Sequence, residues 1–194
     1  MRWFFGTLFA LFVCFGIYAG SAIVSLHGLV EAVRAGNGVE VLTRTDTARL
    51  RRSLVDQIVS AYLKQIGRDR PVKPLERLAA NTYGATVAVA MIGKILTSEN
   101  LTTILSKGAI VVGGAEASML RLTDIDPFEV IETLKRISPT KPVEFQIRLG
   151  KVESEGSVSL HFEGNGWKLS GIQLPSAAVQ VLAQSLVKNT GRNG

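Results

Sequence analysis

The sequence predicts an α+β protein: an amino-terminal transmembrane helix, then several helices packed on an antiparallel sheet of three or more strands, and a terminal helix. Residues 3–26 contain no charged residue and no proline, and as a helix they reach about 36 Å, enough to cross a bilayer. Residues 47–106 repeat apolar side chains at spacings of three to four, as helices do. Residues 143–174 instead alternate apolar and polar side chains, the period of strands with one buried face. Helices followed by such a sheet can close into a cone that holds a pocket.

The amino-terminal segment, residues 1–35, is interpreted as a membrane anchor rather than a cleaved signal peptide. Arg2 supplies the positive start that both share, and small residues at 19–22 offer a cleavage site. The apolar run continues past that site through Ile23, Val24 and Leu26, and then as an amphipathic stripe to Val33. Helix across the site favours a retained single-pass anchor, and secretion after cleavage is the alternative.

The rest of the chain fits one α+β domain over residues 36–190, with a disordered tail at 191–194. Arg2 precedes the span, and a span at the start of a chain usually inserts with its short end in the cytoplasm. The domain is therefore expected outside the cytoplasm. The only cysteine, Cys14, lies in the membrane segment, so the domain forms no internal disulfide.

Caps and helix breakers place the helices. A Gly-Asn-Gly turn at 36–38 precedes a short helical turn at 39–43. Longer helices are expected over 47–66, 75–96, 98–106 and 126–137. Asp46 or Thr45 is expected to cap the first of these, Thr97 the third and Asp126 the fourth. Pro139 and Pro142 end the last of these helices. Residues 109–117, which include two glycines, are read as a loop.

Strands are expected over residues 143–149, 157–163 and 167–174, and a helix over 176–188. Two glycines around Asn165 predict a hairpin between the second and third strands. Trp167 occupies an apolar position of the alternation, so it is expected in the core with Val158, Leu160 and Phe162 rather than on a ligand.

Basic residues gather after the anchor: nine lie within 44–77, whereas five acids lie within 116–132. Arg49, Arg51 and Arg52 are the candidate surface or partner contacts. They could meet anionic lipid headgroups or another envelope protein. A solvated helix face, or pairing with the acidic segment, is the favoured interpretation. Nucleic acid is excluded as a partner, because no basic residues interleave with aromatic ones.

The residues form no catalytic, cofactor-binding or metal-binding pattern. Ser138 and Lys141 have the Ser-x-x-Lys spacing of penicillin-interacting enzymes, but they lie in a proline turn and the two further motifs are missing. His27 and His161 have no nucleophile or metal ligand near them in the sequence. The acids at 124–132 fit helix capping better than a calcium loop. We therefore expect no cofactor and no metal, and we lean against an enzyme.

The segment from Asp46 to Gln57 resembles a motif of the bacterial domain-of-unknown-function family 2939, roughly Asp-Phe-Pro-x-Leu-Arg-x-Ser-Leu-x-x-Gln. Its matching positions are Asp46, Leu50, Arg51, Ser53, Leu54 and Gln57, whereas Thr47 and Ala48 depart from it. Segments 29–38, 97–99 and 166–175 are similar to other pieces of the family. The resemblance implies a membrane or export segment and a small domain of unestablished function, and it carries no catalytic residues. The expected location is the bacterial inner membrane, with the domain in the periplasm.

The sequence is compatible with three classes of function, given in order of preference. The first is a non-catalytic interaction or scaffold module, expected to show a filled core and an exposed apolar or basic patch. The second is a module that binds a small apolar or lipid-like molecule in an enclosed pocket between helices and sheet. The third is an enzyme with an unrecognised site, marked by a cleft of perturbed titratable groups. Arg51, inside the motif, is expected to pair with Asp46 or to reach a partner.

Overall fold

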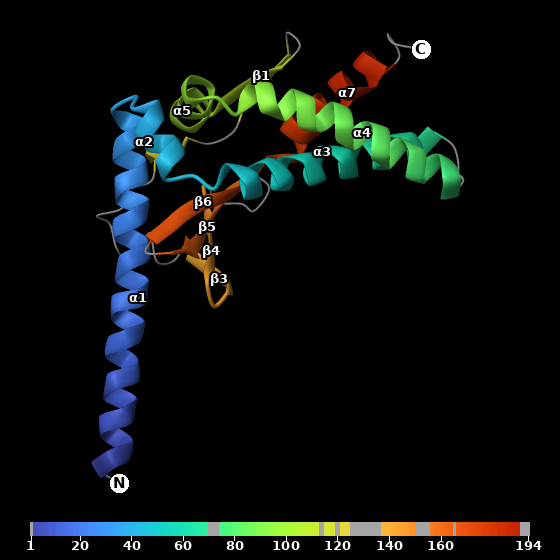
Figure 1. Cartoon of the computed structure of the whole chain (residues 1–194). Helices are drawn as coiled ribbons and strands as arrows, with labels where there is room; N and C mark the ends of the chain where they lie inside the picture. The colour runs from blue at the N-terminus through green and yellow to red at the C-terminus, as the bar shows by residue number, and fades with distance from the viewer. Residues whose placement is uncertain are drawn as a thin grey trace.

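The computed structural model describes residues 2–69, 74–112, 115–118, 121–124, 137–149, 156–164 and 166–190. Helix α1 (Arg2–Arg34) is a single uninterrupted helix, and its amino-terminal half stands clear of the rest of the molecule (Figure 1). The other elements gather around its carboxyl-terminal half. The predicted helix is confirmed, and it continues well beyond residue 26.

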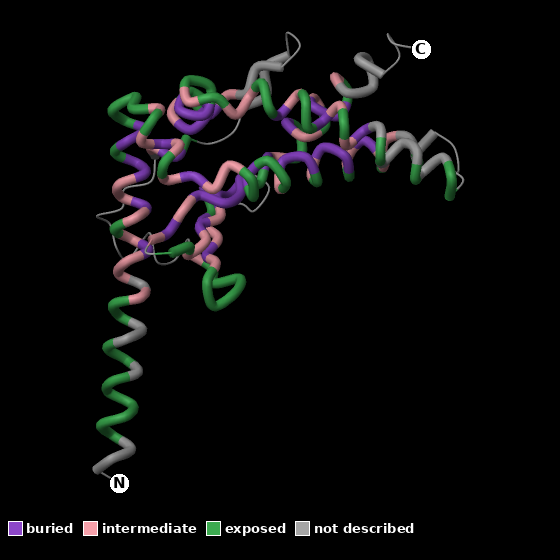
Figure 2. The backbone as a smooth tube through the Cα atoms, viewed as in Figure 1, coloured by how far each residue is buried: buried purple, intermediate pink, exposed green. Residues whose placement is uncertain are grey.

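Burial changes sharply along α1, as Figure 2 shows. Phe5, Phe9, Phe12 and Ile17 expose 66–75% of their surface. From Ala22 onward one face is buried, at the spacing of three to four that an amphipathic helix requires, by Ala22, Leu26, Leu29, Val30 and Val33. The helix therefore has a bare half and a half that belongs to the domain core.

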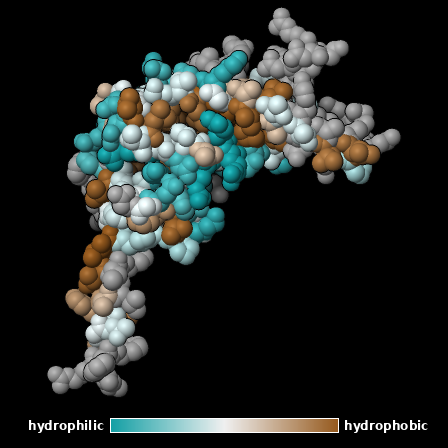
Figure 3. Space-filling model, in the orientation of Figure 1, coloured by the Kyte–Doolittle hydropathy of each residue, from teal (hydrophilic) through white to brown (hydrophobic). Residues whose placement is uncertain are grey.

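Within the described residues, one helix is long and apolar enough to cross a membrane, with Gly16–Arg34 meeting that test. Signal sequences and buried core helices pass the same test. Among the described residues, the bare half of α1 is the part that other elements leave exposed, and Figure 3 shows apolar residues on part of its surface. The domain boundary at residue 35 stays a prediction, because the second half of α1 packs into the core.

Caps define the elements that follow. Gly36, with φ of +67°, ends α1 in the left-handed conformation that glycine adopts freely. The Asn37 side chain accepts from the Glu40 backbone N–H at 3.1 Å and starts α2 (Gly38–Thr43). The Asp46 carboxylate accepts from the Arg49 backbone N–H at 3.0 Å and starts α3 (Thr47–Asp69). The predicted turn, short helix and Asp46 cap are confirmed.

Helices α3 and α4 (Pro74–Ile95) form a hairpin that projects sideways from α1 (Figure 1). Helix α5 (Ser98–Lys107) is capped by Thr97, as predicted, and ends at Gly108 with φ of +63°. The short helix η1 (Leu122–Asp124) and the terminal helix α7 (Ser176–Thr190) complete the described helices. The predicted helix from residue 126 lies outside the described residues up to position 136.

The sheet has four antiparallel strands in the order β3-β4-β5-β6, over Ile137–Lys141, Glu144–Arg148, Ser157–Glu163 and Gly166–Gln173. The last three strands and the hairpin at Gly164 are confirmed. The prediction of a proline turn at 138–141 is wrong, because these residues form β3. Proline is tolerated there because β3 is an edge strand and its pairing with β4 is irregular next to Pro139.

A second correction concerns residues 109–117, which the sequence left as a loop. They form two short antiparallel strands, β1 (Ala109–Val112) and β2 (Ala115–Ser118). Each strand has only four residues, so neither shows enough alternation to be recognised.

One apolar core joins the sheet to the helices. It contains residues of β4, β5 and β6 together with one face each of α1, α3 and α5. The apolar cavity bounded by Leu54, Ile92 and Leu182 measures only about 10 Å³, about the smallest space that can hold a water molecule. These side chains therefore pack closely, and the α+β fold class is confirmed.

Candidate functional site

Helix α3 is fastened along the free edge of β6 by hydrogen bonds. The Asp46 N–H donates to the Leu169 carbonyl, and the Leu169 N–H donates to the Arg44 carbonyl, each at 2.8 Å. Three turns later, the Gln57 amide nitrogen donates to the Ile172 carbonyl at 2.8 Å, and its oxygen accepts from the Leu174 N–H at 3.0 Å. The Gln57 amide thus pairs with β6 as a neighbouring strand would.

These contacts give the motif residues Asp46 and Gln57 structural roles. Asp46 begins α3 and Gln57 holds it against the sheet. An unprotected strand edge is a template for unwanted pairing, and here the edge of β6 is covered by this chain's own side chain and backbone.

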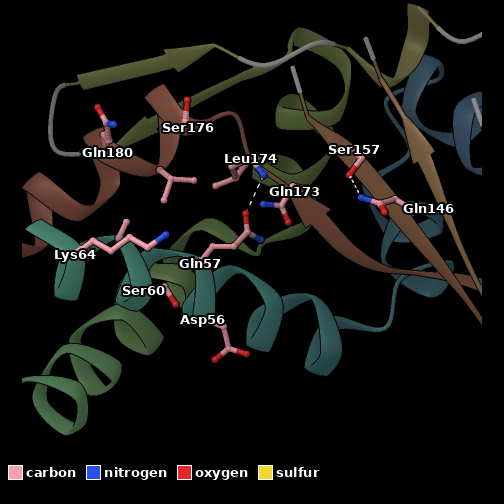
Figure 4. Close-up of a pocket in the computed structure, with 12 residues that line it drawn as sticks. Asp56, Gln57, Ser60, Lys64, Gln146, Ser157, Gln173, Leu174, Ser176 and Gln180 are labelled. Atoms are coloured by element: carbon pink, nitrogen blue, oxygen red, sulfur yellow. Dashed lines mark hydrogen bonds between the residues drawn. The ribbon is translucent and has the colours of Figure 1, made fainter. Parts of the chain in front are cut away.

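A groove of about 800 Å³ lies between α3, the sheet and α7 (Figure 4). Such volumes are typical of ligand sites. Seven of its twelve lining residues carry an amide or a hydroxyl, namely Gln57, Ser60, Gln146, Ser157, Gln173, Ser176 and Gln180, and three are apolar. Gln146 donates to the Ser157 hydroxyl at 2.6 Å.

Two titratable side chains, Asp56 and Lys64, also line this groove. In Figure 4 Lys64 reaches into the space between α3 and α7, whereas Asp56 points away from the other labelled side chains. Both are exposed. The described lining of the groove therefore combines neutral hydrogen-bonding groups and apolar side chains with one cation that faces into it.

The three candidate arginines lie at the start of α3 and are all exposed. Asp46 pairs with Arg49, whose Nε lies 3.0 Å from the Asp46 carboxylate. Of the two alternatives for Arg51, the structure shows Asp46 paired with Arg49, one helical turn beyond the cap, and not with Arg51; contact of Arg51 with a partner stays a prediction. Arg51 and Arg52 face solvent.

The other candidates of the sequence are dispersed. Ser138 and Lys141 lie on β3 rather than at a helix start, and Lys141 pairs with Glu144 at 3.1 Å. His27 lies 3.5 Å from Glu31 on α1, and His161 is on β5. Asp126, Glu129 and Glu132 lie outside the described residues. Over the part of the chain that is described, no group of three potential metal ligands comes together.

An aromatic cluster marks the point where α1 meets the sheet. Trp167 is 4% exposed, and its ring lies 5.1 Å from Tyr18, 4.7 Å from Phe145 and 5.4 Å from Phe162 between centroids. Its indole N–H donates to the Ser21 hydroxyl at 2.9 Å. The predicted core position of Trp167 is confirmed, and the cluster is also the junction between the bare and packed halves of α1.

The sequence predicted an enclosed apolar pocket between helices and sheet, but neither the residues of this groove nor its amides and hydroxyls. Its walls come from residues 56–64, 146–157 and 173–180, which only the fold brings together. One signal was present, because Gln57 was among the residues that carried the family resemblance. The polar face of the strands was predicted, but nothing in its alternation marked a hollow.

Comparison with known proteins adds one finding. No curated protein and no solved structure matches the chain. A protein family described as "protein of unknown function (DUF2939)" matches residues 11–104, just under half of the chain. That stretch runs from the bare half of α1 through most of α5 and contains both Asp46 and Gln57. The expected resemblance is thereby confirmed: from its apolar helix to α5, this chain is similar to the DUF2939 family.

Proposed function

We propose that the chain is a single-pass protein of the bacterial inner membrane whose domain is a non-catalytic interaction module held in the periplasm. The observation that carries this proposal is the division of α1 into a bare apolar half and a packed half. A bare helix with phenylalanines 66–75% exposed is unfavourable in water. A bilayer removes that cost, because it surrounds the same side chains with hydrocarbon.

The length of α1 up to its contacts with the sheet supports a retained anchor. The bare part from Arg2 to Ile17 rises about 24 Å, and the next helical turn, to Ser21, brings the total to about 30 Å, the thickness of a hydrocarbon core. Cleavage at residues 19–22 would cut α1 at its contact with the sheet. It would remove Tyr18 from the aromatic cluster and break or expose the bond between Trp167 and Ser21. The junction therefore favours the anchor over the cleaved signal peptide.

The nature of the partner follows from the geometry of α3. Arg44, just before this helix, lies against Gly28 of α1, which is ten residues beyond Tyr18, or about 15 Å along the helix. That exceeds the Debye length of about 8 Å at physiological salt. If the membrane surface is near Tyr18, the basic start of α3 is poorly placed for lipid headgroups, and another envelope protein is the better proposed partner for Arg49, Arg51 and Arg52.

A second candidate function is ligand binding, and one observation favours a particular form of it. The enclosed apolar cavity of about 10 Å³ has no room for a lipid-like molecule, whereas the polar groove has a volume of about 800 Å³. A ligand in this groove would be rich in amides or hydroxyls. The interaction module ranks first because the groove is open and holds no described pair of facing acid and base.

Membrane insertion and orientation are tested together. A carboxyl-terminal reporter enzyme that needs disulfides for activity should be active, and the full chain should stay in the membrane pellet after alkaline carbonate washing. A shortened chain in the soluble fraction would mean that the segment is a cleaved signal. An inactive reporter on a chain that remains in the pellet would place the domain in the cytoplasm.

A further inference from the structure

The turn between β3 and β4 is tied to α1 at the point where the helix leaves the domain. The Tyr18 hydroxyl donates a hydrogen bond to the Pro142 carbonyl within this turn. The Tyr18 ring also lies 5.8 Å from that of Phe145, on the strand that follows the turn. The turn and this level of α1 are therefore fixed to each other and move together.

The turn is directed along the bare half of α1, toward the amino terminus, as Figure 1 shows. Its residues Lys141, Pro142 and Val143 are all exposed, and Val143 leaves 41% of its surface in contact with solvent. An exposed aliphatic residue beside a lysine is a common composition for segments that meet a membrane surface, because the long lysine side chain can reach outward to water.

The length of α1 brings this turn to the bilayer. Between Arg2 and Ile17 the helix rises only about 24 Å, less than the roughly 30 Å of a hydrocarbon core. Covering the apolar layer therefore requires residues 18–21 to enter it or the bilayer to thin locally. Either way, Tyr18 lies within about one helical turn of the membrane boundary, where tyrosine is favoured, and the turn that it holds lies at the same level.

The charges near the turn are balanced. Lys141 pairs with Glu144 at 3.1 Å, and Lys168 of the neighbouring hairpin pairs with Glu163 at 3.4 Å. This surface has no excess of either sign among these four groups, so it has no electrostatic preference for anionic lipid. Apolar contact is the interaction that remains.

We propose that the β3–β4 turn rests in the headgroup region of the bilayer that α1 crosses, with Val143 against lipid. The proposal depends on the anchoring role of α1 and adds a second contact with the membrane. A single helix leaves a domain free to tilt, whereas a helix and a turn together set its orientation. The α3–α4 hairpin, which projects sideways from α1, is then held over the membrane surface.

Depth-dependent quenching tests this contact on the full chain. Cys14→Ser removes the native thiol, and Val143→Cys or Lys141→Cys then carries an environment-sensitive fluorophore. Val39→Cys is the matched control, because Val39 is 72% exposed and lies on α2 at the far end of α1. In phosphatidylcholine vesicles with quencher-labelled lipids, fluorescence at both turn positions should at least halve, while that at position 39 should hardly change.

The outcomes separate this inference from the proposed function. Membrane retention of each labelled chain is measured first by carbonate washing, and loss from the pellet would refute the anchor itself. A retained chain with no quenching at either turn position would overturn the membrane contact and leave the anchor intact. Quenching that appears only when anionic lipid is added would also overturn the proposal, because it would show an electrostatic contact.

Discussion

At the scale of single residues, Gln57 shows how one amide can hold a helix against a sheet. Its side chain bonds the Ile172 carbonyl on β6 and the Leu174 N–H just beyond the end of that strand. Buried backbone groups without partners are costly, so the cost of losing Gln57 exceeds that of one ordinary surface hydrogen bond.

The first prediction compares two glutamines of the groove. Gln57→Ala should lower the free energy of unfolding by about 1–3 kcal/mol, because it leaves two backbone groups unpaired. Gln173→Ala, at an exposed position, should change it by less than about 0.5 kcal/mol. Denaturant unfolding in detergent, followed by circular dichroism, measures both. Equal effects would show that the Gln57 bonds to β6 are not what the residue contributes.

The second prediction concerns the stability that Trp167 contributes. This residue fills the space between α1 and the sheet, so Trp167→Ala should cost about 3–5 kcal/mol, as for other large core aromatics. Trp167→Phe keeps most of the ring but loses the donor to Ser21, and should cost less. The same denaturant titration measures the loss of stability in both variants. A loss below about 1 kcal/mol for the alanine variant would place the indole on the surface and restore it as a ligand platform.

At the scale of elements, the start of α3 allows the stability contributed by helix capping to be compared with that contributed by an exposed charge. Asp46 caps the helix through the Arg49 N–H and also pairs with the Arg49 side chain, whereas Arg51 is exposed. Asp46→Ala should therefore destabilise the protein by about 0.5–2 kcal/mol. Arg51→Ala should have an effect within about 0.5 kcal/mol, the usual range for exposed positions. A larger loss for Arg51 in thermal unfolding would contradict this order.

Many of the helices and strands were predictable because the local sequence signals for them were strong. Asp46 and Thr97 marked helix starts, the alternation in 157–174 marked two strands, and the glycines around Asn165 marked their hairpin. Strand β3 was missed because Pro139 and Pro142 are helix-ending residues in any sequence window, and only its position at the sheet edge makes a strand with proline acceptable. A pocket between helices and sheet was expected, but the residues that line this groove were not predicted because they are distant in the chain.

At the scale of the whole molecule, α1 is both a proposed anchor and a wall of the core. Its sequence did not show where one role ends, because lipid and a protein core select the same apolar side chains. The difference appears only in three dimensions, where Phe12 is 75% exposed and Leu26 is fully buried. The fold thus determines which part of α1 is bare and which part is packed, and the hydropathy of the helix does not show it.

The last prediction uses this division. One alanine inserted between Leu26 and His27 rotates the two parts of α1 by about 100° relative to each other. Ala22 and Leu26 then no longer share a face with Leu29, and exposing one or two large side chains costs about 1.5–3 kcal/mol each.

The midpoint of thermal unfolding in detergent should therefore fall by roughly 6–12 °C for a loss of about 3 kcal/mol in a chain of this size. The matched control is one alanine inserted between Phe12 and Val13, which rotates only the bare helix and should leave the midpoint unchanged. Both chains should remain in the membrane after carbonate washing, because each keeps the apolar segment. If the two insertions lowered the midpoint equally, the packed half of α1 would not be part of the domain, and the anchor would end where the sequence alone placed it.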